Sequence, residues 1–250
     1  MSRLTLPAIV LFFCGIGAAS AAEPLHVAAA SDLEFAMNEI VLGYEKLHPG
    51  ATIEVTYGSS GNFTAQIQQG APFDMFFSAD SAYPQQLQKA GLAASEVRPY
   101  GIGRIVLWSA QVDASKLRLE DLADPKFAKV AIANPRHAPY GQRAEEALRA
   151  ARLWDAVEPK LVYGENIAQT AQFVQSGNAQ IGIIALSLAL NPAMASRGGY
   201  FLIPDSLHAP LVQAFIITRR AAGDPLATDF ANYFESGPAR ATLARYGFKR

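Results

Sequence analysis

The sequence predicts an α/β fold, built as two lobes that each contain a mostly parallel sheet. Short runs of apolar and β-branched residues alternate along the chain with stretches whose apolar residues recur every three or four positions. The alternation begins a second time near residue 104, and neither a Ser/Gly-rich nor a charged linker separates the two series. With 250 residues, of which 50% are hydrophobic and 17% charged, the chain is long and apolar enough to bury a sizeable core.

The first 22 residues have the pattern of a secretory signal peptide. Arg3 is followed by a short apolar run and then by Ala19-Ser20-Ala21-Ala22, which contains an A-x-A cleavage site. The run is short for a membrane span, which needs about 20 apolar residues. Cleavage would remove Cys14, the only cysteine, so the mature chain is expected to have no disulfide and no cysteine-based metal site. We therefore expect an exported, periplasmic protein.

The first series consists of three strand–helix pairs. The segment from His26 to Ile40 predicts a buried strand, a tight turn at Ser31-Asp32 and a helix with an apolar face. Ser31 and Glu34 match the capping-box pattern S-x-x-E, so Ser31 is expected to cap that helix. The next two pairs are strands at 51–57 and 74–78 with helices at 63–70 and 81–90.

The second series repeats the pattern and ends in two helices. Its expected strands lie at 104–109, 129–134, 161–163, 180–186, 200–203 and 211–218, and its expected helices at 142–151, 167–176, 225–235 and 238–246. We expect lobe 1 to comprise residues 23–103 plus 211–250 and lobe 2 to comprise residues 104–210. The chain crossings between the lobes would then act as hinges.

Four residues lie where a predicted strand hands over to a predicted helix: Ser31, Ser60, Tyr140 and Ile167. Ligands of open α/β sheets bind beyond the carboxyl ends of the strands, so these helix starts are expected to converge on the cleft. The N-terminus of a helix has unpaired N–H groups and partial positive charge, and it binds anions without Lys or Arg. Taken alone, Ser31 is more simply a helix cap. Together, the four starts offer only hydrogen-bond donors, which suits a fully ionised anion.

Other classes of function find less support in the sequence. Ser59 and Ser60 lie in GSSGN, which does not match the G-x-S-x-G nucleophile pattern. The four histidines have no paired spacing, and neither an H-E-x-x-H nor a Walker pattern occurs. The formal net charge of −1 gives no reason to expect a nucleic-acid or membrane-surface partner. We therefore expect a binding protein without a cofactor and not an enzyme.

Several longer motifs resemble the periplasmic molybdate-binding proteins of bacterial ABC transporters. They are AAASDL (28–33), YGSSGN (57–62), GAPFDMFFSAD (70–80), NPRHAPYG (134–141) and RYGF (245–248). The resemblance extends over nearly the whole mature sequence. It implies a two-lobed periplasmic binding-protein fold of type II, which holds molybdate or tungstate in the interlobe cleft by hydrogen bonds alone. It also implies a monomer that delivers its ligand to a membrane permease.

By position, the resemblance implies five ligand-binding residues: Ser31, Asp32, Ser60, Tyr140 and Ile167. Ser31 would contribute its hydroxyl and its amide, and Asp32, Tyr140 and Ile167 would contribute backbone amides. Molybdenum would be bound only as the oxyanion, through Ser31, Ser60, Tyr140 and Ile167.

Two positions depart from what the resemblance implies. Some members of the family have a ligand tyrosine where this chain has Ala185, and the Tyr140 side chain is a candidate to replace it. The Asp32 carboxylate would repel an anion, so we expect it to point away from the site and to cap the chain locally.

Two alternatives remain open. The first is a protein of the same architecture for another oxyanion, such as sulfate or phosphate. Phosphate needs an acceptor for its retained proton, and only Asp32 is placed to provide one. The second is a secreted hydrolase that uses Ser31 or Ser60 as its nucleophile. It ranks last, because the sequence places no base beside either serine.

Overall fold

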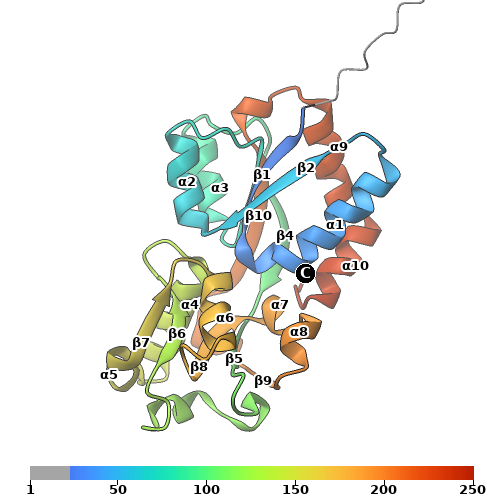
Figure 1. Ribbon diagram of the computed structural model, residues 1–250. Coiled ribbons are helices and arrows are strands. Elements are labelled where there is room, and N and C mark those ends of the chain that lie inside the picture. The colour runs from blue at the N-terminus through green and yellow to red at the C-terminus, as the bar shows by residue number, and fades with distance from the viewer. Residues whose placement is uncertain (1–22) are drawn as a thin grey trace, which may run out of the picture.

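The computed structural model describes residues 23–250 and forms two α/β lobes. The predicted signal peptide at residues 1–22 lies outside the described residues. Figure 1 shows one lobe above the other, with both chain crossings between them. Each lobe is built around one five-stranded sheet. None of the helices within residues 23–250 is both long and apolar enough to cross a membrane.

Lobe 1 contains the sheet with strand order β2-β1-β3-β10-β4. Its strands are β1 (Leu25–Ala30), β2 (Ile53–Gly58), β3 (Met75–Ser78), β4 (Arg98–Gly103) and β10 (Leu211–Ile217). Its helices are α1 (Glu34–Leu47), α2 (Ser60–Gln68), α3 (Ala82–Lys89), α9 (Pro225–Phe234) and α10 (Gly237–Arg245). Helices α2 and α3 cover one face of the sheet, and α1, α9 and α10 cover the other (Figure 1).

Lobe 2 contains the sheet with strand order β7-β6-β8-β5-β9. Its strands are β5 (Ile105–Trp108), β6 (Val130–Ala133), β7 (Leu161–Gly164), β8 (Ile181–Ala185) and β9 (Tyr200–Leu202). Its helices are α4 (Pro139–Ala150), α5 (Trp154–Val157), α6 (Ile167–Gln175), α7 (Leu186–Ala189) and α8 (Pro192–Ala195). Short 3₁₀ turns complete the chain: η1 (Ser31–Leu33), η2 (Ala114–Lys116), η3 (Leu119–Ala123), η4 (Glu158–Lys160), η5 (Asp205–Leu207) and η6 (Arg219–Ala221).

Both sheets are mixed, although four of the five strands in each sheet run in the same direction. In lobe 1, β1 pairs parallel with β2 and β3, whereas β10 pairs antiparallel with β3 and β4. In lobe 2, β6 pairs parallel with β7 and β8, whereas β5 pairs antiparallel with β8 and β9. The reason is the route of the chain. It enters β5 and β10 directly from the other lobe, at the cleft end, so only these two strands run away from the cleft.

The two-lobed α/β class predicted from the sequence is confirmed, and most predicted elements form within a few residues of their expected bounds. Strand β4 was not predicted. Its sequence RPYGIG contains one proline and two glycines, both of which are unfavourable in strands. It forms nevertheless at the edge of the sheet, where it pairs with β10 and where Ile102 bridges to Lys249.

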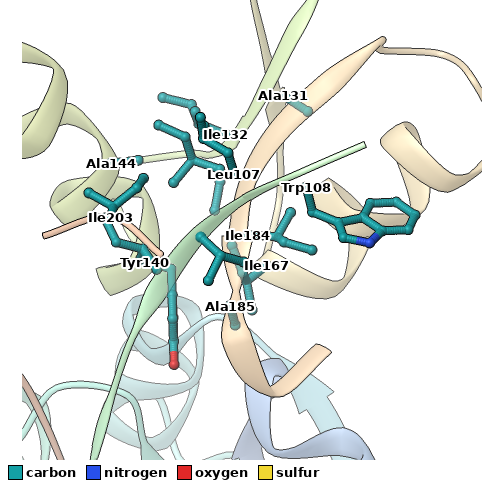
Figure 2. Packing of buried hydrophobic residues seen from close by; sticks show 14 of the residues in the cluster. Leu107, Trp108, Ala131, Ile132, Tyr140, Ala144, Ile167, Ile184, Ala185 and Ile203 are labelled. Atoms are coloured by element: carbon teal, nitrogen blue, oxygen red, sulfur yellow. The ribbon is translucent and has the colours of Figure 1, made fainter. Parts of the chain in front are cut away.

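The lobes are in apolar contact. The buried cluster of lobe 2 gathers around β5, β6 and β8, and Figure 2 shows part of it, including Leu107, Ile132 and Ile184. Ala30 and Ala79 of lobe 1 belong to the same cluster, although they end or follow strands of the other sheet. The ends of the lobe 1 strands are therefore packed directly against lobe 2.

Candidate functional site

A small cavity lies between the lobes, and it brings together all five residues singled out in the sequence. Ser31, Asp32 and Ser60 reach it from lobe 1, and Tyr140 and Ile167 reach it from lobe 2. The remaining lining residues are Ala30, Gly58, Ser59, Ala79, Ala138 and Pro139. Its volume is about 10 Å³, which is about the space of one water molecule, so the lobes leave little open room between these residues. No Lys or Arg lines it, which leaves hydroxyl and backbone groups as its donors.

Three of these residues stand in the first turn of a helix. Ser60 begins α2, Tyr140 is the second residue of α4, and Ile167 begins α6. The N–H groups of a first helical turn have no acceptor inside their own helix. Pro139 suits the start of α4, because proline has no N–H to leave unpaired. The site thus receives unpaired donors and the partial positive charge of helix N-termini from both lobes.

The Ser60 hydroxyl is fixed by lobe 1 itself. Its Oγ accepts a hydrogen bond from the Ala79 N–H at 3.0 Å, and the side chain is fully buried. Accepting from Ala79 leaves the hydroxyl proton of Ser60 for a group in the cavity. Ser60 is therefore oriented as a donor before any ligand is present.

The Ser31 hydroxyl links the two lobes instead of capping its own helix. Its Oγ accepts from the Ala168 N–H and donates to Asn166 Oδ1, both at 3.2 Å. Neither η1 nor α1 has a side-chain cap, so the capping box predicted at Ser31 and Glu34 is wrong. The chain forms a 3₁₀ turn at Ser31–Leu33 first, and α1 begins only at Glu34. Ser31 therefore lies beside the start of α6 and not at the cap of α1.

The Asp32 side chain is buried in a polar network. The local cap expected from the sequence does not form, because the hydrogen bonds of the carboxylate come from residues distant in sequence. Its Oδ2 accepts from the Tyr140 hydroxyl at 3.0 Å and from Gln213 Nε2 at 2.7 Å. Gln213 Nε2 also donates to the Tyr140 hydroxyl at 3.1 Å, and Tyr100 donates to Gln213 Oε1 at 2.6 Å. The Ser187 hydroxyl donates to the Asp32 carbonyl at 2.7 Å. These partners come from both lobes and include residues of β4, which precedes one chain crossing, and of β10, which follows the other.

This network also decides the role of the Tyr140 side chain. In this structure the only proton of its hydroxyl is donated to Asp32, so in this arrangement the hydroxyl has none to offer to an anion. In Figure 2 the Tyr140 hydroxyl points away from the labelled apolar cluster, toward the lobe 1 ribbon. Ala185 is fully buried and does not line the cavity.

Burial changes the acid–base chemistry of the network. Desolvation raises the pKa of Asp32 to about 7, although the hydrogen bonds from Gln213 and Tyr140 lower it. Burial also raises the pKa of Tyr140 and of Tyr100 well above the ordinary value, and the negative charge of Asp32 adds to both shifts. Both tyrosines are therefore neutral donors at physiological pH, and Asp32 is the one group lining the cavity that titrates near neutrality.

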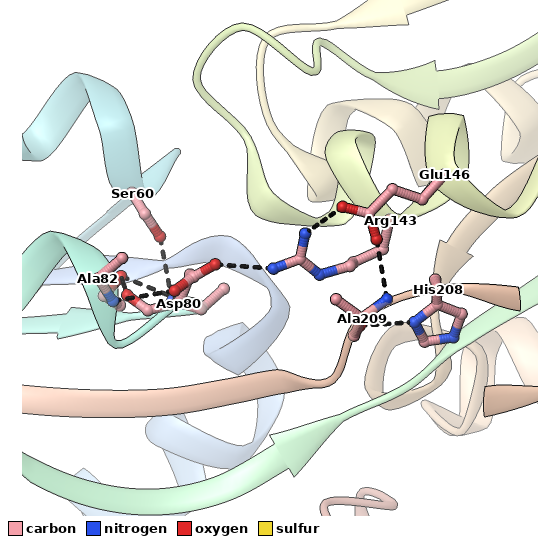
Figure 3. A network of polar contacts seen from close by, with 9 residues as sticks. Ser60, Asp80, Ala82, Arg143, Glu146, His208 and Ala209 are labelled. Atoms are coloured by element: carbon pink, nitrogen blue, oxygen red, sulfur yellow. Dashed lines mark hydrogen bonds and ion pairs between the residues drawn. The ribbon is translucent and has the colours of Figure 1, made fainter. Parts of the chain in front are cut away.

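Polar contacts next to the cavity hold the lobes together. Arg143 of α4 forms an ion pair with Asp80 of lobe 1 at 2.9 Å and a second one with Glu146 at 2.7 Å (Figure 3). The Gly61 N–H donates to the His137 carbonyl at 2.9 Å, and His137 Nδ1 lies 3.0 Å from Ser59 Oγ. The structure therefore represents a closed arrangement of the lobes.

Several residues of the site were missed from the sequence. Gln213 carried the clearest signal, since it is a lone amide within the apolar strand LVQAFII and is fully buried. A polar side chain at such a position needs hydrogen-bond partners. Tyr100 lies in the unpredicted strand β4, and the ion pair of Asp80 with Arg143 joins residues 63 positions apart, so no local pattern pointed to them.

Comparison with known proteins gives consistent matches over almost the whole described chain. Residues 25–249 match the model of the family described as bacterial extracellular solute-binding protein. The chain is 35% identical over 232 residues to the molybdate-binding protein ModA of Azotobacter vinelandii, which covers 92% of this chain and 91% of that relative. It is 32% identical to ModA of Rhodobacter capsulatus, with 92% and 89% covered.

A solved structure agrees with these sequence matches. The periplasmic molybdate-binding protein of Azotobacter vinelandii superposes with a TM-score of 0.84 at 30% sequence identity. The match covers 90% of this chain and 99% of that one. The similarity therefore includes both lobes and the cleft between them.

Proposed function

The chain belongs to the family of bacterial extracellular solute-binding proteins, and from that premise we propose that it binds molybdate in the periplasm. The observation that carries the proposal is the small interlobe cavity, where neutral donors from two lobes meet without any Lys or Arg. The names of relatives at 35% and 32% identity support molybdate as the ligand. We propose Ser31, Ser60, Tyr140 and Ile167 as the groups that hold the oxyanion.

Each proposed ligand group has a defined part. Ser60 donates its hydroxyl proton, and Tyr140 and Ile167 donate their first-turn N–H groups. Ser31 donates its hydroxyl after turning from Asn166, whose Oδ1 keeps its bond from the Gln169 N–H at 2.9 Å. Hydrogen bonds to charged groups are the strong ones, so this set is suited to a dianion.

We further propose a transport role without catalysis. The protein would act as a monomer that closes its lobes around molybdate or tungstate and delivers the ion to the permease of an ABC transporter. Lobe 1 would comprise residues 23–103 plus 211–250 and lobe 2 residues 104–210, moving about the crossings after β4 and before β10. No cofactor takes part in this role.

Calorimetric titration with molybdate, tungstate, sulfate and phosphate at pH 7 tests the proposal. Molybdate and tungstate are nearly equal in size and should bind within about tenfold of each other, a difference near 1.4 kcal/mol. Sulfate has shorter bonds and cannot reach every donor, and each donor left unpaired costs about 1–3 kcal/mol. Two or three such losses make sulfate weaker by orders of magnitude. Sulfate that binds as tightly as molybdate would contradict the proposed ligand.

A further inference from the structure

One oxygen of the Asp32 carboxyl accepts two hydrogen bonds, and the other accepts none. Oδ2 accepts from Tyr140 and from Gln213, whereas Oδ1 is buried and has no hydrogen-bond partner within residues 23–250. The residue is only 1% exposed and lines the interlobe cavity. A buried polar atom without a partner costs free energy, so one at a cavity wall points to a ligand or a proton at that position.

The groups that face Asp32 do not neutralise its charge. Tyr140 of α4, Tyr100 of β4, Gln213 of β10 and Ser187 of α7 surround it, and all four are uncharged. Helix α6 also packs on η1, and its sequence IAQTAQFVQ contains no titratable side chain.

Among the described residues, no charged side chain on the packed elements forms an ion pair with Asp32. Arg143 of α4 pairs with Asp80 and Glu146. Glu34 of α1 is half-buried and lines the neighbouring pocket with Gln169. Arg104, between β4 and β5, donates to the Gly247 carbonyl. An ionised Asp32, buried as it is, would thus stand beside a bound dianion without a compensating cation.

We propose that Asp32 is protonated when the oxyanion is bound, with its carboxyl O–H as a further donor to the ligand. The inference rests on the proposed function and deepens it. One proton moves from solvent to Oδ1, and no other bond changes. Oδ2 keeps both of its hydrogen bonds, and Oδ1 gains a hydrogen-bond partner. The residue that seemed unsuited to an anion site then becomes one of its donors, and binding is coupled to proton uptake.

The acid–base chemistry of the free protein supports this coupling. A carboxyl with a pKa of about 7 is largely ionised at pH 8 and largely protonated at pH 6. A bound dianion raises that pKa further, because like charge disfavours ionisation. Linkage then requires uptake of about 0.9 proton per ligand at pH 8 and about 0.1 at pH 6. The affinity should fall by about tenfold for each pH unit above neutrality.

Proton uptake is measured by titrating molybdate at pH 8 in several buffers that differ in ionisation enthalpy. The slope of the observed enthalpy against the buffer enthalpy gives the number of protons taken up. We expect about 0.9 for the wild-type protein and nearly zero for Asp32→Asn, whose amide N–H₂ takes the place of the carboxyl O–H. The affinity of Asp32→Asn should also be independent of pH between 6 and 9. Glu34→Gln is the matched control, and it should keep the wild-type uptake.

The outcomes separate this inference from the proposed function. Absence of molybdate binding would refute the proposed function itself. Molybdate binding without proton uptake, or uptake that persists in Asp32→Asn, would leave that function intact and overturn the inference. Loss of proton uptake in Glu34→Gln would mean that Glu34, and not Asp32, takes up the proton, which would overturn the inference. Phosphate that binds tightly and is lost in Asp32→Asn would mean that Asp32 accepts a proton from the ligand rather than donating one.

Discussion

At the scale of single residues, the same side chains line the cavity and join the lobes. Ser31 bonds to the start of α6, and the Asp32 carboxylate accepts from Tyr140 of the other lobe. Ser60 differs, because its partner Ala79 belongs to its own lobe. Substitution of Ser31 or Asp32 should therefore affect lobe closure as well as ligand binding. Substitution of Ser60 should affect the ligand-binding surface of lobe 1.

Ser60→Ala should weaken molybdate binding by roughly 10- to 150-fold, since a hydrogen bond to a charged group contributes about 1.5–3 kcal/mol. It also leaves the buried Ala79 N–H without its acceptor, which should lower the free energy of unfolding by about 1–3 kcal/mol. Calorimetry and urea denaturation measure the two effects. Ser196→Ala, at an exposed serine of lobe 2, is the control and should change neither. Wild-type affinity in Ser60→Ala would remove Ser60 from the proposed ligand groups.

Asp32 should make the ligand-free protein less stable as pH rises from about 4 to 7. Its pKa is raised from 3.8 to about 7 on folding, so in this range the folded state binds more protons than the unfolded state. As pH rises from 4 to 7, the free energy of unfolding of the wild-type protein should therefore fall relative to that of Asp32→Asn, by up to roughly 4 kcal/mol. Above pH 7 the difference between the two proteins should be constant. Urea denaturation of both proteins at pH 4, 5.5, 7 and 8.5 measures it. A difference independent of pH would mean that Asp32 ionises normally.

At the scale of elements, the start of α2 is shaped for contact with the other lobe. Gly61 is its second residue, and a Cβ there would lie 2.8 Å from the His137 carbonyl oxygen and 2.9 Å from the His137 Cα. Both atoms belong to the loop before α4. Real Cβ atoms do not approach backbone atoms this closely. A glycine at this position therefore lets the two lobes meet.

Gly61→Ala should weaken molybdate binding by tenfold or more without lowering the melting temperature. Alanine is favoured over glycine in helices, so α2 itself is not destabilised, but its methyl group holds the lobes apart. Gly237→Ala is the matched control, because Gly237 begins α10 and an added Cβ meets nothing within 4 Å. Binding that is equal in both variants would contradict the role of this contact in closure.

At the scale of the whole molecule, closure depends on three kinds of contact around one small cavity. Ala30 and Ala79 pack on lobe 2, Arg143 pairs with Asp80, and Gly61 bonds to His137. An ion pair that is largely but not completely buried contributes modestly. These contacts favour the closed arrangement, and a ligand bridging both lobes would add to them.

Saturating molybdate should reduce the radius of gyration of the wild-type protein measured by small-angle scattering. The ligand binds donors from both lobes and so favours the closed arrangement over open ones. Gly61→Ala should compact less than the wild-type protein under the same conditions. Identical scattering curves with and without molybdate would argue against hinge closure.

The sequence alone predicted the alternating pattern, the two lobes, and the helix starts at Ser60, Tyr140 and Ile167 that line the cavity. These predictions succeed because hydrophobic periodicity and helix-start residues are local signals, and because ligands of α/β sheets lie at the carboxyl ends of strands. The strand RPYGIG was not predicted, because its glycines and proline disfavour strands. Pairing with β10 stabilises it in the folded protein.

The tertiary structure alone decided how the polar side chains are used. Asp32 meets Tyr140 and Gln213, which lie 108 and 181 positions away, so its burial and raised pKa follow from packing and not from its neighbours in sequence. Ser31 was predicted as a cap, but the tight turn predicted at Ser31-Asp32 is a 3₁₀ turn that directs the Ser31 hydroxyl toward α6. Local propensity determines which segments become strands and helices. Which donor meets which acceptor is determined by the way two distant lobes close on each other, because the energy of a buried polar group depends on the partners that the fold brings to it.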